Sequence, residues 1–309
     1  MHTASVLYRT RALATTAVRR ALAVSGRSAT RPTSIFTRFN STEAVIPKSM
    51  QPRAEELAAG TVKTVLGDLD ANAPPAHIKP ELWTMYVATL HRLNPDSTWP
   101  PKRRVLHWVL NNADTREELD IALQLTEQWR MHMLPITQAT THIWAQACMR
   151  IKYPEPFVKM LLDRWKYRQL PVTYTLARFI KFLGEMAAQD GDLAEQLLDD
   201  AFRVFALYPY YGLSHDAYAY GALVEACCEV NSEEAWRRAL IASEETLAYE
   251  TPLITLEALQ ALEKRSAERN EPEMAQRYRD LAKQLELKPA GKNAAQFDEE
   301  GNMTSPGFD

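Results

Sequence analysis

Apolar residues recur with a period of about 3.6 along most of this chain, and the stretch from Leu170 to Phe205 shows the pattern most clearly. Its second half has an apolar residue at every fourth position: Leu193, Leu197, Ala201 and Phe205. Its first half follows the same rule at Leu176, Phe179, Ile180, Leu183 and Met186. A polar break at 189–192 separates the halves. This pattern predicts two amphipathic helices, and because one helical hairpin cannot bury two apolar faces, neighbouring pairs must cover them.

Further helices are predicted on both sides of this pair. From Pro100 onward they are expected at about 102–112, 116–132, 138–150, 155–168, 173–188, 192–207, 216–229, 233–248, 252–267 and 271–286, which makes five pairs. The breaks inside the pairs fall at 115, 153, 190, 231 and 270, with spacings of 38, 37, 41 and 39 residues. Such a period is typical of an α-solenoid. The prediction is an all-α fold, an α-solenoid of about five helix-turn-helix repeats over 100–287. An N-terminal helical cap over 41–99, with helices at 52–69 and 80–93, is expected to cover its first face.

Capping residues are expected to mark where the second helices start. A polar side chain followed three residues later by glutamate can satisfy the free amides of a first turn. The pairs with this spacing are Thr115 with Glu118, Asn231 with Glu234, and Asn270 with Glu273. In the third pair Asp190 or Asp192 is expected to serve as the cap, and in the second pair Pro154 and Pro156 open the helix.

Residues 1–40 differ in composition from the rest. They contain seven arginines, no lysine and no acidic residue, which is the composition of a mitochondrial transit peptide. The segment Arg38-Phe39-Asn40-Ser41-Thr42 resembles a matrix-processing site, so the mature chain is expected to begin near Asn40 or Ser41. The alternative is a basic arm that binds nucleic acid. At the other end, 288–309 is rich in Gly, Asn, Asp and Pro and is predicted to be a disordered tail.

Charge is unevenly distributed over the expected mature chain. The whole sequence has 36 basic and 39 acidic side chains, and without residues 1–40 the balance becomes 29 against 39. Residues 101–181 contain 13 Lys and Arg against 7 acids, whereas 182–309 contain 11 against 25. One part could therefore face an anion that the other part would repel.

The sequence offers little for catalysis or metal binding. Its three cysteines, Cys148, Cys227 and Cys228, are expected to be buried thiols, and its histidines lack the spacing of a metal site. We find no phosphate-binding glycine loop, nucleophile motif or apolar stretch long enough to span a membrane. The expectation is a non-enzymatic protein with no cofactor, no metal, no transmembrane segment and no small-molecule substrate.

The junctions between pairs carry a family resemblance. Met133-Leu134-Pro135-Ile136-Thr137 recurs 36 positions later as Gln169-Leu170-Pro171-Val172-Thr173. Val172-Thr173-Tyr174 and the segment from Ala219 to Val224 resemble the start of a pentatricopeptide repeat, although tetratricopeptide-like proteins share the geometry. That resemblance, over about 101–287, implies a superhelix of helix pairs, commonly in mitochondria, whose members bind organelle RNA or belong to mitochondrial ribosomes.

One feature departs from the RNA-reading members of that family. These proteins read one base per repeat with a polar side chain near the fifth position of each first helix. The matching positions here are Leu176 and Ala222 and, in the second pair, a position on or next to Ile143. The side chains of Leu176, Ala222 and Ile143 cannot form a hydrogen bond with a base edge. Readout of a base sequence is therefore not expected.

Two groups of residues are candidates for binding. The first interleaves cations with aromatic rings and is predicted to contact RNA or another anion: Arg130, Arg150, Lys152, Arg164, Trp165, Lys166, Tyr167, Arg168, Arg178 and Lys181. Alternatively, Trp165 lies on the core stripe with Phe157, Leu161 and Leu162, and the cations form a solvated edge. The second candidate is a partner-binding loop with Tyr208, Tyr210 and Tyr211, which could instead pack on its own repeat.

Together these observations predict a mitochondrial helical-repeat protein of the matrix, or of the matrix face of the inner membrane. We expect it to act in mitochondrial gene expression by binding RNA or a ribonucleoprotein such as the mitochondrial ribosome, with a protein partner on its acidic C-terminal half. The alternative is a protein-only scaffold or assembly factor for a respiratory complex of the inner membrane.

Overall fold

The structure is a computed structural model that describes residues 61–95, 97, 99–249, 252–287, 296–297 and 303–304. The predicted transit peptide, the first part of the predicted cap and most of the predicted tail lie outside these residues. The described part is mostly helical, as expected. It contains these twelve α-helices: α2 (Pro80–Arg92), α3 (Arg103–Asn112), α4 (Arg116–Met131), α5 (Gln138–Ile151), α6 (Glu155–Leu162), α7 (Arg164–Tyr167), α8 (Thr173–Gln189), α9 (Ala194–Ala206), α10 (Ala217–Glu229), α11 (Glu233–Leu247), α12 (Leu256–Glu268) and α13 (Pro272–Leu287).

The predicted helix at 52–69 is wrong over its described part. Residues there form an antiparallel hairpin of β1 (Thr61–Thr64) and β2 (Gly67–Asp70), with Thr64 opposite Gly67. Threonine and valine favour extended backbone, and Gly67 has φ +110°, which a residue with a side chain rarely adopts. The hairpin is tied to α2 because the Trp83 indole nitrogen donates to the Asp70 carbonyl at 2.8 Å. A second strand pair, β3 (Gln296–Phe297) with β4 (Met303–Thr304), was also not predicted.

The predicted helix at 155–168 is interrupted. It ends at Leu162, and Asp163 leaves the helical region with φ −103° and ψ 72°. The Asp163 carboxylate then accepts a hydrogen bond from the Lys166 amide at 3.0 Å and caps the short helix α7. The break turns α7 away from the α6 axis, and this decides which of its side chains are buried.

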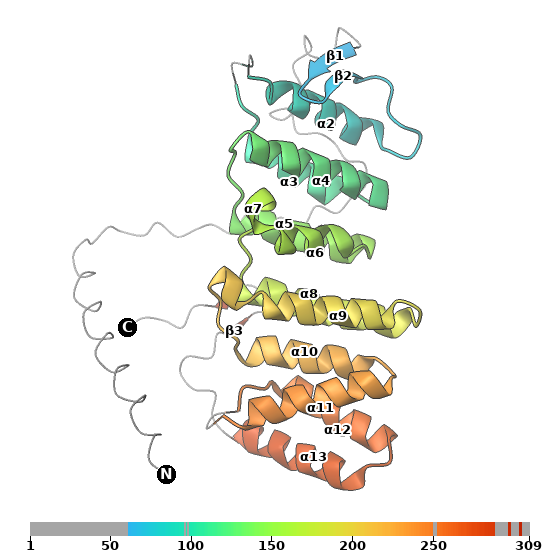
Figure 1. Cartoon of the computed structure of the whole chain (residues 1–309), viewed down its shortest axis with the longest axis vertical. Coiled ribbons are helices and arrows are strands. Elements are labelled where there is room, and N and C mark those ends of the chain that lie inside the picture. The colour runs from blue at the N-terminus through green and yellow to red at the C-terminus, as the bar shows by residue number, and fades with distance from the viewer. Residues whose placement is uncertain are drawn as a thin grey trace, which may run out of the picture. The chain divides into compact units, whose positions relative to one another are not determined.

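Each helix pair packs against the next pair along the chain. The first helices follow one another, with α3 on α5, α5 on α8, α8 on α10 and α10 on α12, and each second helix packs on its own first helix. Figure 1 shows this order from α2 to α13. The connections between pairs, which include α7 and the short 3-10 helix η1 (Pro209–Tyr211), therefore lie at corresponding ends of the pairs.

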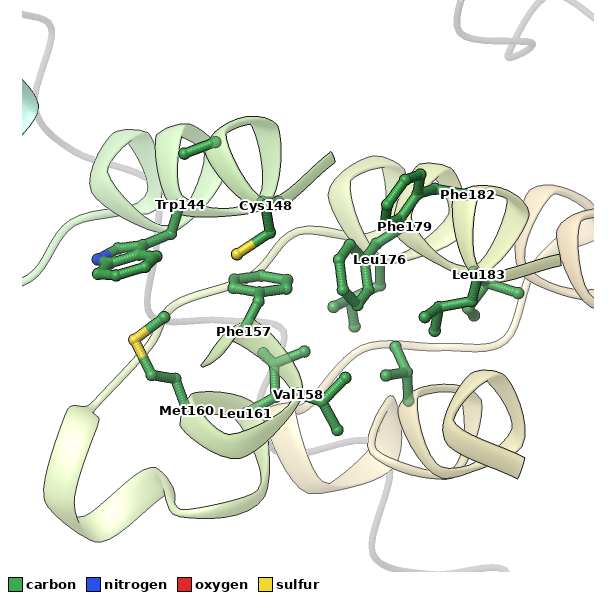
Figure 2. Packing of buried hydrophobic residues seen from close by; sticks show 14 of the residues in the cluster. Trp144, Cys148, Phe157, Val158, Met160, Leu161, Leu176, Phe179, Phe182 and Leu183 are labelled. Atoms are coloured by element: carbon green, nitrogen blue, oxygen red, sulfur yellow. The ribbon is translucent and has the colours of Figure 1, made fainter. Parts of the chain in front are cut away.

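The core consists mostly of the apolar stripes identified in the sequence, but Leu193, predicted to begin the second stripe, is 47% exposed and does not belong to it. Phe157 of α6 lies between the α5 side chains Trp144 and Cys148 and the first turns of α8 (Figure 2). Its ring meets Phe179 of α8 edge to face, with ring centroids 4.8 Å apart. Leu197 of the second predicted stripe is also buried. Several pairs thus share one continuous apolar core.

Some polar contacts between neighbouring first helices repeat. His107 Nε2 of α3 lies 2.8 Å from Thr140 Oγ1 of α5, and His142 Nδ1 of α5 lies 3.1 Å from Thr175 Oγ1 of α8. Both contacts join residues 33 positions apart in the sequence. Equivalent positions of successive pairs therefore make equivalent bonds.

Only part of the predicted capping chemistry is present. The Thr115 hydroxyl accepts from the Glu118 amide at 3.2 Å, so this cap is confirmed. The prolines Pro154 and Pro156 open α6 as predicted. The caps predicted at Asn231, at Asp190 or Asp192, and at Asn270 are wrong. Ser232, one position after Asn231, caps α11 by accepting from the Ala235 amide at 3.0 Å. No side chain caps α9, and Asn270 adopts a left-handed φ of +60° after α12.

Candidate functional site

Five of the ten predicted RNA-binding residues lie on or beside α7. Three of them, Arg164, Trp165 and Arg168, line an open recess of about 450 Å³ together with Gln169, Leu170 and Tyr210. We call this set the junction recess, because it lies at the connection between two helix pairs. No carboxylate contributes to its lining.

Trp165 is 85% exposed and does not belong to the core stripe. The alternative prediction, which grouped it with Phe157, Leu161 and Leu162, fails because it assumed one continuous helix. Phe157 and Leu161 are buried as that prediction required, but Leu162 is 49% exposed. Beyond the break at Asp163 it is Tyr167, not Trp165, that faces the interior, so the Trp165 indole is free in solvent.

Arg164 joins the two predicted sites into one surface. Its Nη1 donates to the Tyr210 carbonyl at 2.6 Å, across 46 residues of sequence. Its guanidinium also lies over the rings of Tyr210 and Tyr211, 5.3 and 5.2 Å from their centroids. The η1 loop and α7 are therefore held against each other.

The three loop tyrosines have different environments. Tyr208 is buried and its hydroxyl donates to the Thr173 carbonyl at 3.1 Å. The Tyr211 hydroxyl donates to the Leu161 carbonyl at 2.8 Å. Tyr208 thus anchors the loop on α8 and Tyr211 anchors it on α6, and burial raises the pKa of Tyr211 to about 12. Tyr210, 44% exposed, is the one of the three that lines the recess.

Two members of the predicted cluster have structural partners. Tyr167 is fully buried, and its hydroxyl donates to the Glu127 carboxylate, so its ring cannot stack on a base. Lys166 Nζ lies 2.9 Å from the same carboxylate. These contacts, together with burial, determine the ionisation of Glu127: burial opposes its charge, but both hydrogen bonds favour it and the pKa falls below the ordinary value. The positive charge of Lys166 and the negative charge of Glu127 therefore largely cancel.

Arg130 and Arg168 provide positive charge close to the recess. Arg130 Nη1 donates to the Leu134 carbonyl at 2.5 Å, which fixes the guanidinium at the end of α4. Burial lowers the pKa of Arg130, and the charge of Arg168 lowers it further, which indicates that the two cations are near each other. Arg168 itself is exposed, with a left-handed φ of +47°, and its backbone amide donates to the Arg164 carbonyl at 2.9 Å. Its side chain has no hydrogen bond or ion pair with the described residues.

Arg150 and Lys152 lie away from the junction recess, at the turn between α5 and α6. Arg150 Nη2 donates to the carbonyls of Leu110 and Ala113 at 2.9 and 2.7 Å, so it closes the end of α3. Lys152 ends α5 with φ +56°, and its Nζ donates to Gln189 Oε1 at 3.0 Å. These two cations connect helix pairs and do not line the recess.

Arg178 and Lys181 line a different hollow, on the side formed by the first helices. This first-helix groove has a volume of about 570 Å³ and carries both signs of charge, with Glu185, Glu225 and Glu257 in its lining. Lys181 Nζ lies 2.6 Å from Glu225, whose pKa burial raises although Lys181 opposes the shift. The positions matched to base readout, Ile143, Leu176 and Ala222, are buried.

Two recess residues were absent from the predicted set. Leu170 is 43% exposed, whereas Gln169 is buried and its Oε1 accepts from the Thr141 hydroxyl at 2.9 Å. The sequence feature that could have pointed to them was the repetition of the segment 133–137 at 169–173. It marked a junction between helix pairs, but it did not indicate that the junction lines a recess.

Other chemistry is not evident in the described chain. Among its residues no group of three or more His, Cys, Asp or Glu side chains could hold a metal ion, and no helix there is long and apolar enough to cross a membrane. Cys148 and Cys227 are buried, and burial raises the pKa of each thiol to about 12, so both stay protonated. No protein-family model matches the chain, and no curated protein does.

Proposed function

We propose that this protein is a non-catalytic α-solenoid of about five pentatricopeptide-like repeats with an N-terminal cap, and that it acts in the mitochondrial matrix. It serves mitochondrial gene expression by docking on RNA or on a ribonucleoprotein such as the mitochondrial ribosome. The arginine-rich, acid-free composition of residues 1–40 supports the location.

The recurrent spacing of polar contacts supports the repeat architecture. Besides the two histidine–threonine contacts, which span 33 residues, the Ser243 hydroxyl of α11 lies 3.4 Å from the Tyr278 hydroxyl of α13, across 35 residues. Contacts separated by about one repeat length are expected when each unit touches only its neighbours, as in a solenoid.

The junction recess is the observation that carries the functional proposal. It presents an exposed indole, a phenol ring and two arginines, without a carboxylate in its lining. Aromatic faces stack on bases and arginines neutralise phosphates, so this combination suits a nucleic-acid ligand.

A purification from mitochondria with and without ribonuclease tests the function. The tagged chain should bring down mitochondrial RNA and the proteins of a ribonucleoprotein, and ribonuclease should reduce both. Recovery of neither mitochondrial RNA nor the proteins of a ribonucleoprotein, with no RNA crosslinked to the chain in intact mitochondria, would contradict the proposal.

The acidic C-terminal half favours a second candidate, a protein-only scaffold or assembly factor for an inner-membrane complex. Residues 182–309 have 25 acids against 11 Lys and Arg, and six of those arginines are already paired with carboxylates: Arg203, Arg237, Arg238, Arg265, Arg269 and Arg279. The remaining negative surface would repel RNA and suits a basic protein partner.

A further inference from the structure

We infer that the ligand of the junction recess is single-stranded RNA, with one base stacked on Trp165 and the adjoining phosphate on Arg168, and that the first-helix groove does not hold the strand. This inference rests on the proposed function and assigns its RNA contact to one place on the molecule. It separates this chain from a reader that lays RNA along its first helices.

Trp165 is exposed on a rigid support. Helix α7 is fixed at its start by the Asp163 cap, and at its end the buried Tyr167 is bonded to Glu127. An indole that is 85% exposed on such a support gains no burial within the described chain. A base that covers it would remove apolar surface from water without first ordering the protein.

The charges around the indole favour an anion. Arg164 is used internally, because it holds Tyr210 in place, and Lys166 is neutralised by Glu127. Arg168 is left as the cation without a partner in the described part of the chain, and Arg130 adds to the field from the neighbouring junction. A phosphate next to the stacked base would lie within reach of Arg168. Its negative charge would also relieve the repulsion between Arg168 and Arg130.

The form of the ligand follows from the aromatic contact. A base can stack on an exposed side chain only if it has left the base stack of a duplex, so the strand must be single. Stacking is tolerant of base identity, and no polar side chain is available at the positions matched to base readout. Binding is therefore expected to depend little on sequence.

The first-helix groove is a poorer place for the same strand. Its lining includes the carboxylates of Glu185, Glu225 and Glu257, and the ion pair with Glu225 occupies Lys181. Arg178 is thus surrounded by more negative than positive charge. A phosphate backbone that followed this groove would meet repulsion along its length.

Oligonucleotide binding by the full chain tests the inference. Anisotropy of a fluorescein-labelled oligo(U) gives affinity, and a 5-iodouridine version crosslinked by light identifies the contacted aromatic residue by mass spectrometry. Trp165→Ala should weaken binding roughly tenfold, as loss of one stacked base does. Arg168→Ala should weaken it a few-fold for oligo(U) and oligo(A) alike and reduce the salt slope by about one. The crosslinked peptide should contain Trp165.

Matched variants give the comparison. Trp99→Ala removes another tryptophan, 67% exposed, and Arg104→Ala removes another exposed arginine, and both should stay within about twofold of wild type, a change of ~0.4 kcal/mol. All variants retain the N-terminal arginines, so their contribution cancels. Arg178→Ala reports on the first-helix groove, and a larger loss there than at Arg168 would overturn the inference.

The outcomes also separate this inference from the proposed function. If the recess variants bind RNA as wild type does, yet lose a ribonucleoprotein partner that survives ribonuclease, the recess is a protein-docking site. The inference would then be wrong while docking on a ribonucleoprotein stands. If wild type recovers neither RNA nor a ribonucleoprotein from mitochondria, the proposed function falls as well.

Discussion

Glu118 illustrates how far a local motif can be read from sequence. Its amide is capped by Thr115 as predicted, but its carboxylate does not return to the Thr115 amide, as a capping box would require. It accepts instead from the amides of Asp114, at 2.7 Å, and Lys79, at 3.0 Å. The spacing predicted the cap, whereas the link to Lys79, 39 residues away, depends on how α2 packs.

At the same scale, helical periodicity alone could not show which of the two side chains, Trp165 or Tyr167, is buried. A continuous helix through 155–168 puts the tryptophan on the apolar stripe, and one non-helical residue, Asp163, exchanges the two faces. Asp163 is a good capping residue, but so are other aspartates in this chain that do not interrupt a helix. The exposure of Trp165, on which the candidate site depends, therefore came only from the structure.

His107 and His142 should make stability depend on pH. Burial lowers the pKa of both, and the charges of Arg103 and Arg178 lower it further, so the folded state prefers neutral rings. The unfolded chain takes up protons near pH 6.5 while the folded state does not. The stability due to these groups is therefore complete above about pH 6.5 and is lost as pH falls below it.

Urea unfolding at pH 7.5 and 5.0 measures this loss. The double variant His107→Gln, His142→Asn keeps a polar atom near each threonine and cannot protonate, so its midpoint should fall less on acidification than that of wild type. His77→Gln, which replaces an exposed imidazole, is the control. Equal falls for wild type and the double variant would show that the two rings are not held neutral.

At the scale of elements, segments with strong helical periodicity were predicted correctly as helices. The weakly periodic segment 52–69 was predicted as a helix, and this was wrong over its described part. From α8 onward the helix boundaries agree with the pattern to within a few residues, because each segment buries an apolar stripe against at least one neighbouring helix. The hairpin β1–β2 lacks such a stripe, and its β-branched residues and Gly67 outweighed the helical reading of 52–69. Where a segment has no long apolar stripe, the intrinsic backbone preferences of its residues decide its secondary structure.

Gly184 sets how closely α8 approaches α10. A Cβ atom at this position would lie 2.4 Å from the Ala226 Cα atom, which belongs to the backbone and cannot move aside cheaply. Alanine normally stabilises a helix relative to glycine by about 1 kcal/mol. Here we expect Gly184→Ala to destabilise the fold by about 1–3 kcal/mol, because the helices must separate.

A thermal melt followed by circular dichroism checks this prediction. Gly191→Ala is the matched control, since nothing lies within 4 Å of the atom that it adds, and its melt should stay close to that of wild type. A Gly184→Ala chain that melts at or above the wild-type temperature would mean that α8 and α10 are not packed this closely.

At the scale of the whole molecule, the candidate site is formed by contacts that no local pattern contains. The sequence supplied both halves of it, the cluster around Arg164 and the loop with Tyr210, but it left them as separate proposals. Their union depends on a bond across 46 residues, which forms only when consecutive helix pairs stack. The same stacking moved Arg150, Lys152, Arg178 and Lys181 to other surfaces, so the positive stretch of sequence is not one positive surface.

The charge of the whole chain leads to a last prediction, on import. Residues 1–40 carry seven arginines and no acid, so an inward-negative membrane potential should draw them across the inner membrane, and their removal leaves 29 basic against 39 acidic side chains. Isolated mitochondria should import the full chain only while energised and release a shorter product that begins near Asn40 or Ser41, which N-terminal sequencing would identify.

Replacing Arg9, Arg11, Arg19 and Arg20 by glutamine should prevent uptake, whereas Arg203→Gln, an exposed position in α9, should not. A chain that remains outside, or that keeps Met1 after uptake, would remove the basis for a matrix function and leave the N-terminal arginines as a possible RNA-binding arm.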